Sequence, residues 1–176
     1  MSALVGPVET ATARLFCARP PANSGATYER LFKDPSVERW LRPPPLDPFR
    51  PADLERLLRH DRSHWQIHGF GPWALVDRES GEFAGRAGLA WTRVEGREAV
   101  ELPWAILPEF QRRGLASEAG ISALEVARKI GLAKVVSLTL VDNVASRGVM
   151  EKIGLEYERD VKHIGLPHAL YSLELE

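Results

Sequence analysis

Pro108-Glu109-Phe110-Gln111-Arg112-Arg113-Gly114-Leu115-Ala116-Ser117, residues 108–117, separate a predicted strand from a predicted helix. Before this stretch, 99–107 places apolar side chains at every second position, which predicts a strand. After it, small and apolar side chains recur every three or four residues from Ala116 to Ile130, which predicts a helix that ends before Gly131. Because a helix start leaves backbone N–H groups unpaired at the positive end of the dipole, the stretch predicts an anion site suited to phosphate.

The turn itself has the pattern Gln-x-x-Gly-x-Ala, with Arg112 and Arg113 beside Gly114. It is not a P-loop, because no Gly-Lys-Ser or Gly-Lys-Thr follows, and it has only one of the three glycines of the dinucleotide-binding fingerprint. An ordinary strand-to-helix turn with two solvated arginines has the same pattern. The turn alone therefore leaves both interpretations open.

The composition excludes several classes of protein. The chain has 176 residues, 44% hydrophobic and 27% charged, with a formal net charge of −1, which predicts one globular domain over residues 1–176. The balanced charge disfavours nucleic acid as a partner, since such proteins carry a basic stripe. Cys17 is the only cysteine, which excludes an internal disulfide and a cysteine-based zinc site. With no bilayer-spanning stretch and no secretion-signal pattern, we expect a cytoplasmic protein without a membrane partner.

The rest of the chain alternates short predicted strands and helices. Residues 1–11 are expected to be loosely ordered, and the prolines of 42–48 predict a stiff surface loop. Strands are predicted at 13–18, 73–77, 83–94, 99–107, 134–141, 155–161 and 169–175, and helices at 27–33, 37–41, 51–68, 116–130 and 142–153. Gly85 and Gly88 indicate a bulge in the 83–94 strand or a close approach of another backbone.

Three histidines recur at every fourth position of the helix predicted at 51–68: His60, His64 and His68. This spacing places them on one helix face, where they could bind a transition metal. The pattern supplies no acidic or sulfur ligand to complete such a shell. A solvated or hydrogen-bonded face is the better interpretation, and no metal is expected.

Two motifs in order carry a resemblance to a known family. Gln111-Arg112-Arg113-Gly114-Leu115-Ala116 is followed, about thirty residues later, by Asn143-x-x-Ser146-x-x-x-Met150-Glu151-Lys152-x-Gly154-Leu155. With the element order and with His68-Gly69-Phe70-Gly71-Pro72-Trp73 before the hairpin, they make the chain similar to the GNAT family of acetyl-CoA-dependent N-acetyltransferases, and within it to the ribosomal-protein (RimJ/RimL-like) branch. The resemblance covers the chain from about Ala13 to its end. It implies a mixed α/β fold: a twisted, mostly antiparallel sheet of six to seven strands, helices on both faces, and a splayed strand pair where coenzyme A enters.

The resemblance also implies how acetyl-CoA, the co-substrate, is held. Backbone N–H groups of the turn would bind the pyrophosphate, which makes Arg112, Arg113, Gly114, Leu115, Ala116 and Ser117 candidate cofactor-binding residues. The splayed edge of the preceding strand would hold the pantetheine arm, which adds Trp104, Ile106 and Leu107, and a freed N–H there would polarise the thioester carbonyl. Asn143 is expected both to cap its helix and to contact this arm.

Pro103 lies in the same strand, at a position where members of the family often carry glycine. A proline cannot donate to a ladder of hydrogen bonds, so it belongs at an edge or a bulge. That is consistent with a strand that separates from its neighbour, and equally with a plain edge proline.

Glu101 and Ser146 are the candidate catalytic residues. An amine is protonated near neutral pH and must lose a proton, and Glu101 matches a position where many relatives carry a glutamate base; a surface carboxylate paired with an arginine is the alternative. Many relatives protonate the departing thiolate with a tyrosine at the position of Met150, which we expect in the core. Ser146 could hydrogen-bond the sulfur instead, or it only satisfies helix N–H groups, and the thiolate also leaves unaided.

The expected function is transfer of an acetyl group to a primary amine, either a protein N-terminus or a small molecule, by direct attack in a ternary complex. The acceptor is expected to contact 22–40, 42–50 and 161–168, and the lack of a dense acidic cluster there disfavours a polycationic acceptor. The protein is expected to be a monomer or a homodimer. Two alternatives remain: a coenzyme A-binding sensor without turnover, and a transferase of longer acyl groups.

Overall fold

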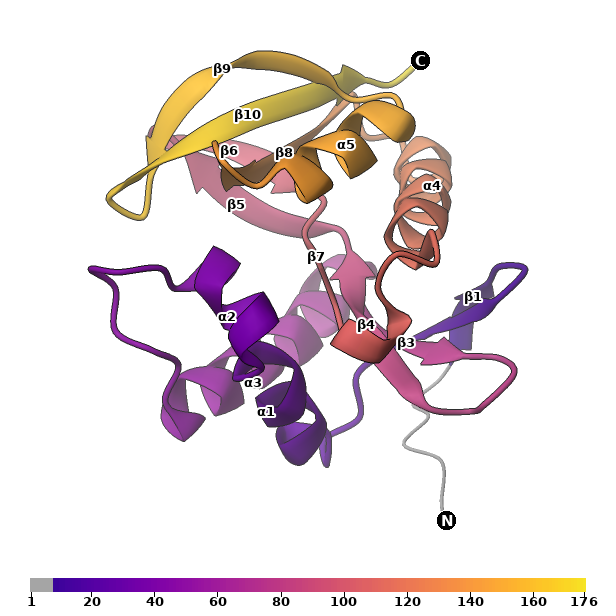
Figure 1. Ribbon diagram of the computed structural model, residues 1–176. Helices are drawn as coiled ribbons and strands as arrows, with labels where there is room; N and C mark the ends of the chain where they lie inside the picture. Colours follow the sequence, from indigo (N-terminus) through magenta and orange to yellow (C-terminus); the bar gives the residue numbers. More distant parts are fainter. Residues whose placement is uncertain (1–7) are drawn as a thin grey trace.

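The computed structural model describes residues 8–176, which form ten strands, five α-helices and a short 3₁₀ helix (Figure 1). The strands are β1 (Val8–Ala11), β2 (Leu15–Ala18), β3 (Pro72–Asp77), β4 (Phe83–Gly88), β5 (Ala90–Val94), β6 (Arg97–Glu101), β7 (Trp104–Ile106), β8 (Lys134–Leu140), β9 (Glu156–His163) and β10 (Leu166–Glu174). The helices are α1 (Gly25–Phe32), α2 (Pro35–Leu41), α3 (Pro51–His68), η1 (Pro108–Phe110), α4 (Leu115–Lys129) and α5 (Val144–Lys152).

The strands form two five-stranded sheets, in the orders β1-β2-β3-β4-β7 and β5-β6-β8-β10-β9. Among the described residues, every strand pairing is antiparallel except that of β6 with β8, which is parallel. The mixed α/β fold class is confirmed, but the described residues form two sheets of five strands rather than one sheet of six to seven.

Two of the expected strands are each divided between the sheets. The 83–94 strand becomes β4 and β5, and the 99–107 strand becomes β6 and β7. At the first division, a Cβ on Gly88 would lie 2.7 Å from Gly71 O, so only glycine allows the two backbones to approach so closely. Gly85 lies at a bulge, since the register between β3 and β4 shifts beside it, and a Cβ there would lie 2.3 Å from Ala105 O. The second division is at Leu102-Pro103, where proline cannot donate to a ladder.

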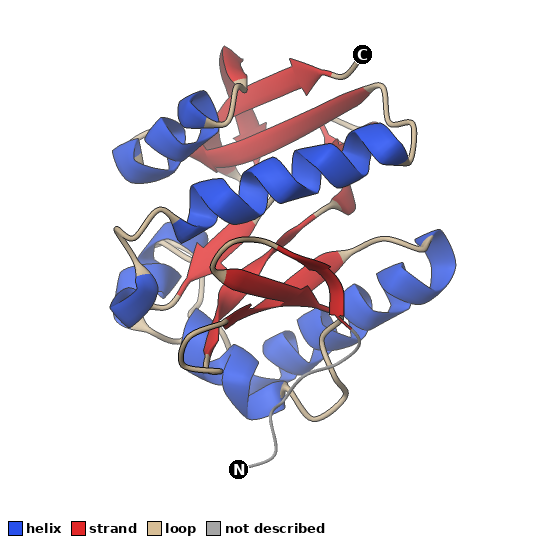
Figure 2. Ribbon diagram, turned by 90° about the vertical axis from the view of Figure 1, so that its right-hand side faces the viewer, coloured by secondary structure: helices blue, strands red, loops and turns tan. Residues whose placement is uncertain are grey.

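The helices cover both sides of the sheets. In Figure 1, α1, α2 and α3 lie on one side of the strands and α4 on the other, and Figure 2 shows α4 lying across the molecule between strands of the two sheets. One large core joins the layers, including Leu15 and Leu75 of the first sheet, Tyr171 of the second and Leu124 of α4. Met150 is buried in this core as expected. None of the described helices is long and apolar enough to cross a bilayer.

A buried polar network fastens α1 and α3 to the first sheet. Arg86 on β4 donates to Asp61 on α3 from Nε (2.6 Å) and Nη2 (2.7 Å), and the Tyr28 hydroxyl on α1 donates to the same carboxylate at 2.8 Å. Burial opposes ionisation of Asp61, but the Arg86 guanidinium and the hydrogen bonds it donates hold the pKa of that carboxyl at about 2. The network therefore holds a buried ion pair beneath the helices.

Candidate active site

The site begins at the point where β6 ends. Leu102 N donates to Val136 O on β8 at 2.8 Å, and the buried Ser137 hydroxyl donates to Leu102 O at 2.9 Å. Beyond this point β7 pairs with β4, while β8 continues alongside β10. Pro103 thus lies where two neighbouring strands separate, as the splayed-strand interpretation requires.

Within residues 8–176, the separation leaves one edge of β7 without a strand partner. Leu107 N donates to Ala84 O at 2.9 Å, and the direction of backbone groups alternates along a strand, so the N–H and C=O groups of Trp104 and Ile106 point away from β4. Gln111 Nε2 donates to Ile106 O at 2.8 Å. The groups left facing β8 are the N–H and C=O of Trp104 and the N–H of Ile106. Leu107, in contrast, is buried and turned toward β4, so the structure does not bring this candidate to the open edge.

A cavity of about 790 Å³ lies along this open edge. Its walls come from α2, from β6 and β7, from the start of α4, from β8, from α5 and from the β9–β10 hairpin. It brings together these residues expected from the sequence: Glu101, Trp104, Ile106, Arg112, Gly114, Leu115, Ala116, Ser117, Asn143 and Ser146. Arg113 and Leu107 do not line it.

The turn before α4 has the backbone geometry of an anion cradle. Arg112 has φ 56° and Gly114 has φ 77°, two left-handed residues within one turn. The first backbone bond of α4 is Glu118 N to Gly114 O at 3.0 Å, and among the described residues the N–H groups of 112–117 donate to no backbone carbonyl outside the helix. A left-handed residue other than glycine costs on the order of 1 kcal/mol, and Glu95 and Ile164 adopt the same conformation in hairpin turns. The unpaired N–H groups at the helix start, rather than the φ of Arg112, therefore support the anion site.

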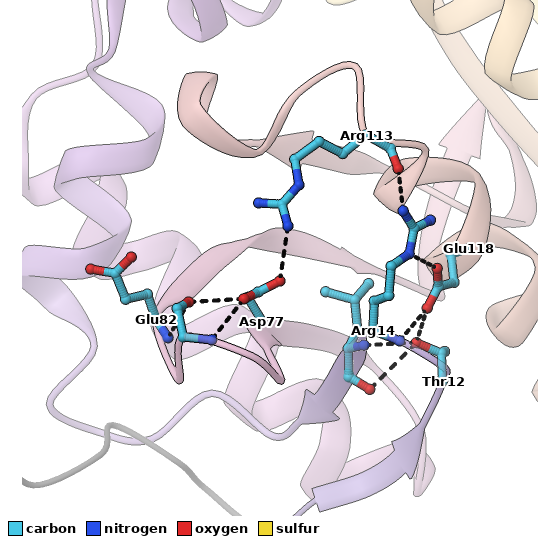
Figure 3. Close-up of polar contacts among 8 residues, drawn as sticks. Thr12, Arg14, Asp77, Glu82, Arg113 and Glu118 are labelled. Carbon is cyan, nitrogen blue, oxygen red and sulfur yellow. Dashed lines mark hydrogen bonds and ion pairs between the residues drawn. The ribbon is translucent and has the colours of Figure 1, made fainter.

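The side chain of Arg113 supports this turn from outside the cavity. Its guanidinium lies 3.6 Å from the Asp77 carboxylate and 5.3 Å from the Phe110 ring, and Figure 3 shows it directed toward Asp77. In the same view Arg14 contacts both the Arg113 carbonyl and the Glu118 carboxylate, with Nε 2.7 Å from Glu118 Oε2. These pairs tie the residue before β2 and the last residue of β3 to the cradle, which holds the backbone of the cradle in place without occupying it.

Glu101 lies at the end of β6, partly accessible from the cavity. Burial, the larger influence, raises the pKa of Glu101 to about 7, against the opposing effects of the Arg86 guanidinium and of a hydrogen bond with Thr92. No arginine forms an ion pair with it in the described structure, unlike Glu98 on the same strand, which lies 3.7 Å from Arg93. A carboxyl with a pKa near 7 is suited to accept a proton near neutral pH.

Asn143 and Ser146 interact with each other at the start of α5. Asn143 Oδ1 accepts from Ser146 N at 3.3 Å, which caps the helix as expected, and Asn143 Nδ2 donates to Ser146 Oγ at 3.1 Å. The Ser146 hydroxyl acts there as an acceptor, so its own proton remains available to a group in the cavity.

Other lining residues were not expected from the sequence, or only as part of a broad segment. Lys152 on α5 and Leu138 and Thr139 on β8 line the cavity, and no local pattern distinguishes them. Of the three acceptor segments expected, 22–40 and 161–168 contribute through α2 and the β9–β10 hairpin, whereas 42–50 lines no part of the cavity.

The histidine face of α3 is hydrogen-bonded. His64 Nδ1 lies 2.6 Å from Phe70 O, and Nε2 accepts from Trp91 N at 3.0 Å, so both ring nitrogens have protein partners. Burial lowers the pKa of His64, which favours this neutral form. The described residues contain no cluster of three or more His, Cys, Asp or Glu side chains placed to hold a metal ion.

Comparison with known proteins identifies the family. The sequence model of the Acetyltransferase (GNAT) domain matches residues 16–156. The chain belongs to the GNAT acetyltransferase family. This membership confirms the resemblance to the GNAT family found in the two motifs, and it supports the expected acetyltransferase activity.

A curated relative and two solved structures place the chain among GNAT proteins. The uncharacterized protein YkkB of Bacillus subtilis (strain 168) is 29% identical over 108 residues, which are 60% of this chain and 62% of YkkB. An acetyltransferase from Agrobacterium tumefaciens strain C58 superposes with a TM-score of 0.79 at 23% identity, covering 96% of this chain and 94% of that one. RimL, a ribosomal L7/L12 α-N-protein acetyltransferase in complex with coenzyme A, gives 0.75 at 16% identity, covering 96% and 98%. At these identities the two structures show the shared fold.

Proposed function

We propose that the protein transfers an acetyl group from acetyl-CoA to a primary amine, by direct attack within a ternary complex. The observation that carries this proposal is that one cavity contains the open edge of β7, the start of α4 and the partly accessible carboxyl of Glu101. Acetyl transfer to an amine needs a site for an extended thiol ester, a cradle for its phosphates and a base, and these features correspond to the three needs.

Acetyl-CoA would supply the thioester, whose carbonyl carbon gains a bond to the amine nitrogen while its bond to sulfur breaks and sulfur leaves with the electron pair. The free N–H groups of 112–117 would bind the pyrophosphate. The N–H and C=O of Trp104 and the N–H of Ile106 would hold the pantetheine arm as an added strand.

Glu101 would accept the proton of the amine, directly or through a water molecule. The Ser146 hydroxyl would donate a hydrogen bond to the departing sulfur. A thiolate is also a fair leaving group unaided, so the contribution of Ser146 should be smaller than that of Glu101.

The first test is calorimetric binding of acetyl-CoA to the wild type and to Gly114→Trp. Gly114 opens the cradle with φ 77°, a conformation that residues with side chains rarely adopt, and a Cβ there would lie 3.3 Å from the Arg14 guanidinium, so a tryptophan should distort the backbone of the cradle. Gly131→Trp is the matched control, because Gly131 also has φ 77° but follows the other end of α4 and has open space around it. Binding lost in Gly114→Trp and retained in Gly131→Trp is the expected result; absence of binding to the wild type would refute the proposal.

The second test is release of coenzyme A thiol in the presence of amines. Binding without release from any amine would favour a coenzyme A sensor. Faster release from succinyl-CoA than from acetyl-CoA would favour transfer of a longer acyl group.

We also propose that residues 1–176 act as one cytoplasmic acetyltransferase domain, as a monomer or a homodimer. Light scattering of the purified protein measures the oligomeric state directly.

A further inference from the structure

The half of the cavity that lies away from the cradle has a distinct set of side chains. We call it the acceptor half and define it by Val37, Arg39 and Trp40 of α2 and by His163, Ile164 and His168 of the β9–β10 hairpin. Figure 1 shows α2 and this hairpin on the same side of the molecule. The aliphatic and aromatic members form an apolar wall, and the other members are a guanidinium and two imidazoles.

The acceptor half shares one sheet face with Glu101. Glu101 pairs with Val136, and Val136 pairs with Ser172, so these side chains lie on one face. His168 is four residues from Ser172 along β10, and an even separation returns to that face. The backbones of Glu101 and His168 are therefore about 16 Å apart, since His168 lies two strands across the sheet and four residues along β10. At about 3.3–3.6 Å per extended residue, this distance limits an acceptor that reaches from Glu101 to His168 to about four residues.

The charges of the acceptor half are cationic or neutral. The Arg39 guanidinium stacks on the Trp40 ring at 4.8 Å, and no carboxylate lies within ion-pair distance of it among residues 8–176. His163 and His168 meet edge to face with centroids 5.3 Å apart, and His168 Nδ1 lies 3.0 Å from Leu166 O. Two carboxylates line the cavity among the described residues, Glu101 at the end of β6 and Asp142 between β8 and α5.

We propose that the acceptor is a small amine that carries an apolar side chain and its own carboxylate, as an amino acid or a di- or tripeptide does. This proposal rests on the function proposed above. The amine lies beside Glu101, the apolar side chain packs against Val37 and Trp40, and the carboxylate faces Arg39 and the hairpin histidines. An arginine without a carboxylate partner is the donor best suited to bind a carboxylate, with two parallel N–H···O bonds.

The same charges disfavour the other acceptors. A polycationic amine would bring further positive charge toward the Arg39 guanidinium, which has no carboxylate partner among residues 8–176 to offset the repulsion. A protein N-terminus would continue past Arg39 as an amide chain and leave the guanidinium without an anion.

The test uses matched acceptors with free and amidated C-termini. Phenylalanine, phenylalanyl-leucine and phenylalanyl-leucyl-valine, each as the free acid and as the amide, are compared by thiol release from acetyl-CoA, with spermidine as the polycation. We expect kcat/KM for the free acid to exceed that for its amide at least tenfold at one or more of the three lengths. Equal values for acid and amide at every length, a preference for spermidine, or no release from any of these acceptors by a protein that binds acetyl-CoA would each overturn the proposal.

Arg39→Gln tests the residue that carries the specificity. We expect it to lower kcat/KM for the preferred free acid about 10- to 100-fold, through KM, while the amide and acetyl-CoA binding remain unchanged. Arg42→Gln is the matched control, since Arg42 stacks on Phe49 at 4.6 Å just after α2 and does not line the cavity. Equal losses for acid and amide, or equal effects of the two substitutions, would contradict recognition of a carboxylate by Arg39.

These outcomes are separate from failure of the proposed function. If the protein did not bind acetyl-CoA, the fault would lie with the coenzyme site. If it acetylated other amines but did not distinguish acid from amide, only the acceptor proposal would fall.

Discussion

A carboxyl group on a covered sheet face holds its proton more tightly than one in water, and Glu101 is in this position. Its raised pKa affects the rate and the stability in opposite ways. The base that accepts a proton from the amine is the ionised form, which predominates above pH 7. The same ionised form is the one that burial disfavours in the folded protein.

Replacement of Glu101 by Gln should reduce turnover and alter its pH dependence. With a pKa of about 7, the rate of the wild type should rise as pH increases through 7, because the ionised base becomes the major form. In Glu101→Gln we expect kcat about 10² to 10⁴ lower, loss of this rise, and an unchanged dissociation constant for acetyl-CoA. Steady-state kinetics from pH 5.5 to 9 provides the measurement.

The same substitution should stabilise the fold at alkaline pH. The folded-state pKa of about 7 lies above the ordinary glutamate value of 4.5, so between these two pH values the folded state binds more protons and stability falls as pH rises. Ionisation of Glu101 therefore costs up to about 3 kcal/mol above pH 7. Urea unfolding at pH 5 and pH 8 should show a smaller loss of stability on going to pH 8 in Glu101→Gln than in the wild type.

Glu98→Gln is the control for both measurements. Glu98 lies on the same strand, β6, but is exposed and paired with Arg93. Exposed pairs of this kind contribute about 0–1 kcal/mol, so we expect little change in rate or stability. A pH profile that Glu98→Gln alters as much as Glu101→Gln does would contradict the assignment of the base.

At the scale of single elements, the start of α5 has two side chains whose expected roles differ, one structural and one catalytic. The cap of this helix is the bond from Ser146 N to Asn143 Oδ1, which involves the Asn143 side chain but only the backbone of Ser146. Asn143→Ala should therefore cost about 1 kcal/mol, or 2–4 °C in Tm. Ser146→Ala keeps the cap and should change Tm by less, while lowering kcat about tenfold if the hydroxyl assists the departing sulfur.

Thermal unfolding and kinetics of the two variants distinguish these roles. An unchanged kcat in Ser146→Ala, with a Tm loss equal to that of Asn143→Ala, would leave the hydroxyl with only a structural role.

The elements that could be predicted from the sequence are those whose ends have local signals. Helix α3 has the predicted bounds, 51–68, because Pro51 opens it and Gly69 closes it with φ 72°. Pro103 indicated that the 99–107 strand could separate from its neighbour, but its division between two sheets could not be predicted, because Leu102 and Trp104 keep the same alternation while the backbone changes partner. Side-chain periodicity indicates which face of a sheet a residue occupies, but it does not indicate which neighbouring strand its backbone hydrogen-bonds to.

The same distinction between local signals and distant contacts applies to the site. The cradle at 112–117 could be predicted, because a glycine turn before a helix is a local feature. The direction of the Arg113 side chain could not, since it depends on Asp77, far away in the sequence. The contribution of α2 to the cavity likewise depends on how α1 and α3 pack, which no short pattern encodes.

At the scale of the whole molecule, the network of Tyr28, Asp61 and Arg86 connects two helices to a sheet. Asp61→Ala leaves the buried Arg86 without its partner, and we expect a loss of about 3–5 kcal/mol, roughly 10 °C in Tm. Tyr28→Phe removes one hydrogen bond and keeps the ion pair, so its cost should be about 1.5 kcal/mol. Chemical unfolding of both variants tests this order, and equal losses would show that the ion pair is not the main contributor.

The path of the chain between the two sheets determines what happens when the protein is cut into two pieces. The chain builds β1 to β4 in one sheet, β5 and β6 in the other, returns for β7 and then completes the second sheet with β8 to β10. Every cut between β1 and β10 therefore separates strands that belong to one sheet. We expect that the two pieces of a chain cut in the turn between β3 and β4 would not fold separately but would reassemble when brought together. Since the cavity draws on α2 from one piece and α4 and α5 from the other, recovered acetyltransferase activity would report the reassembly.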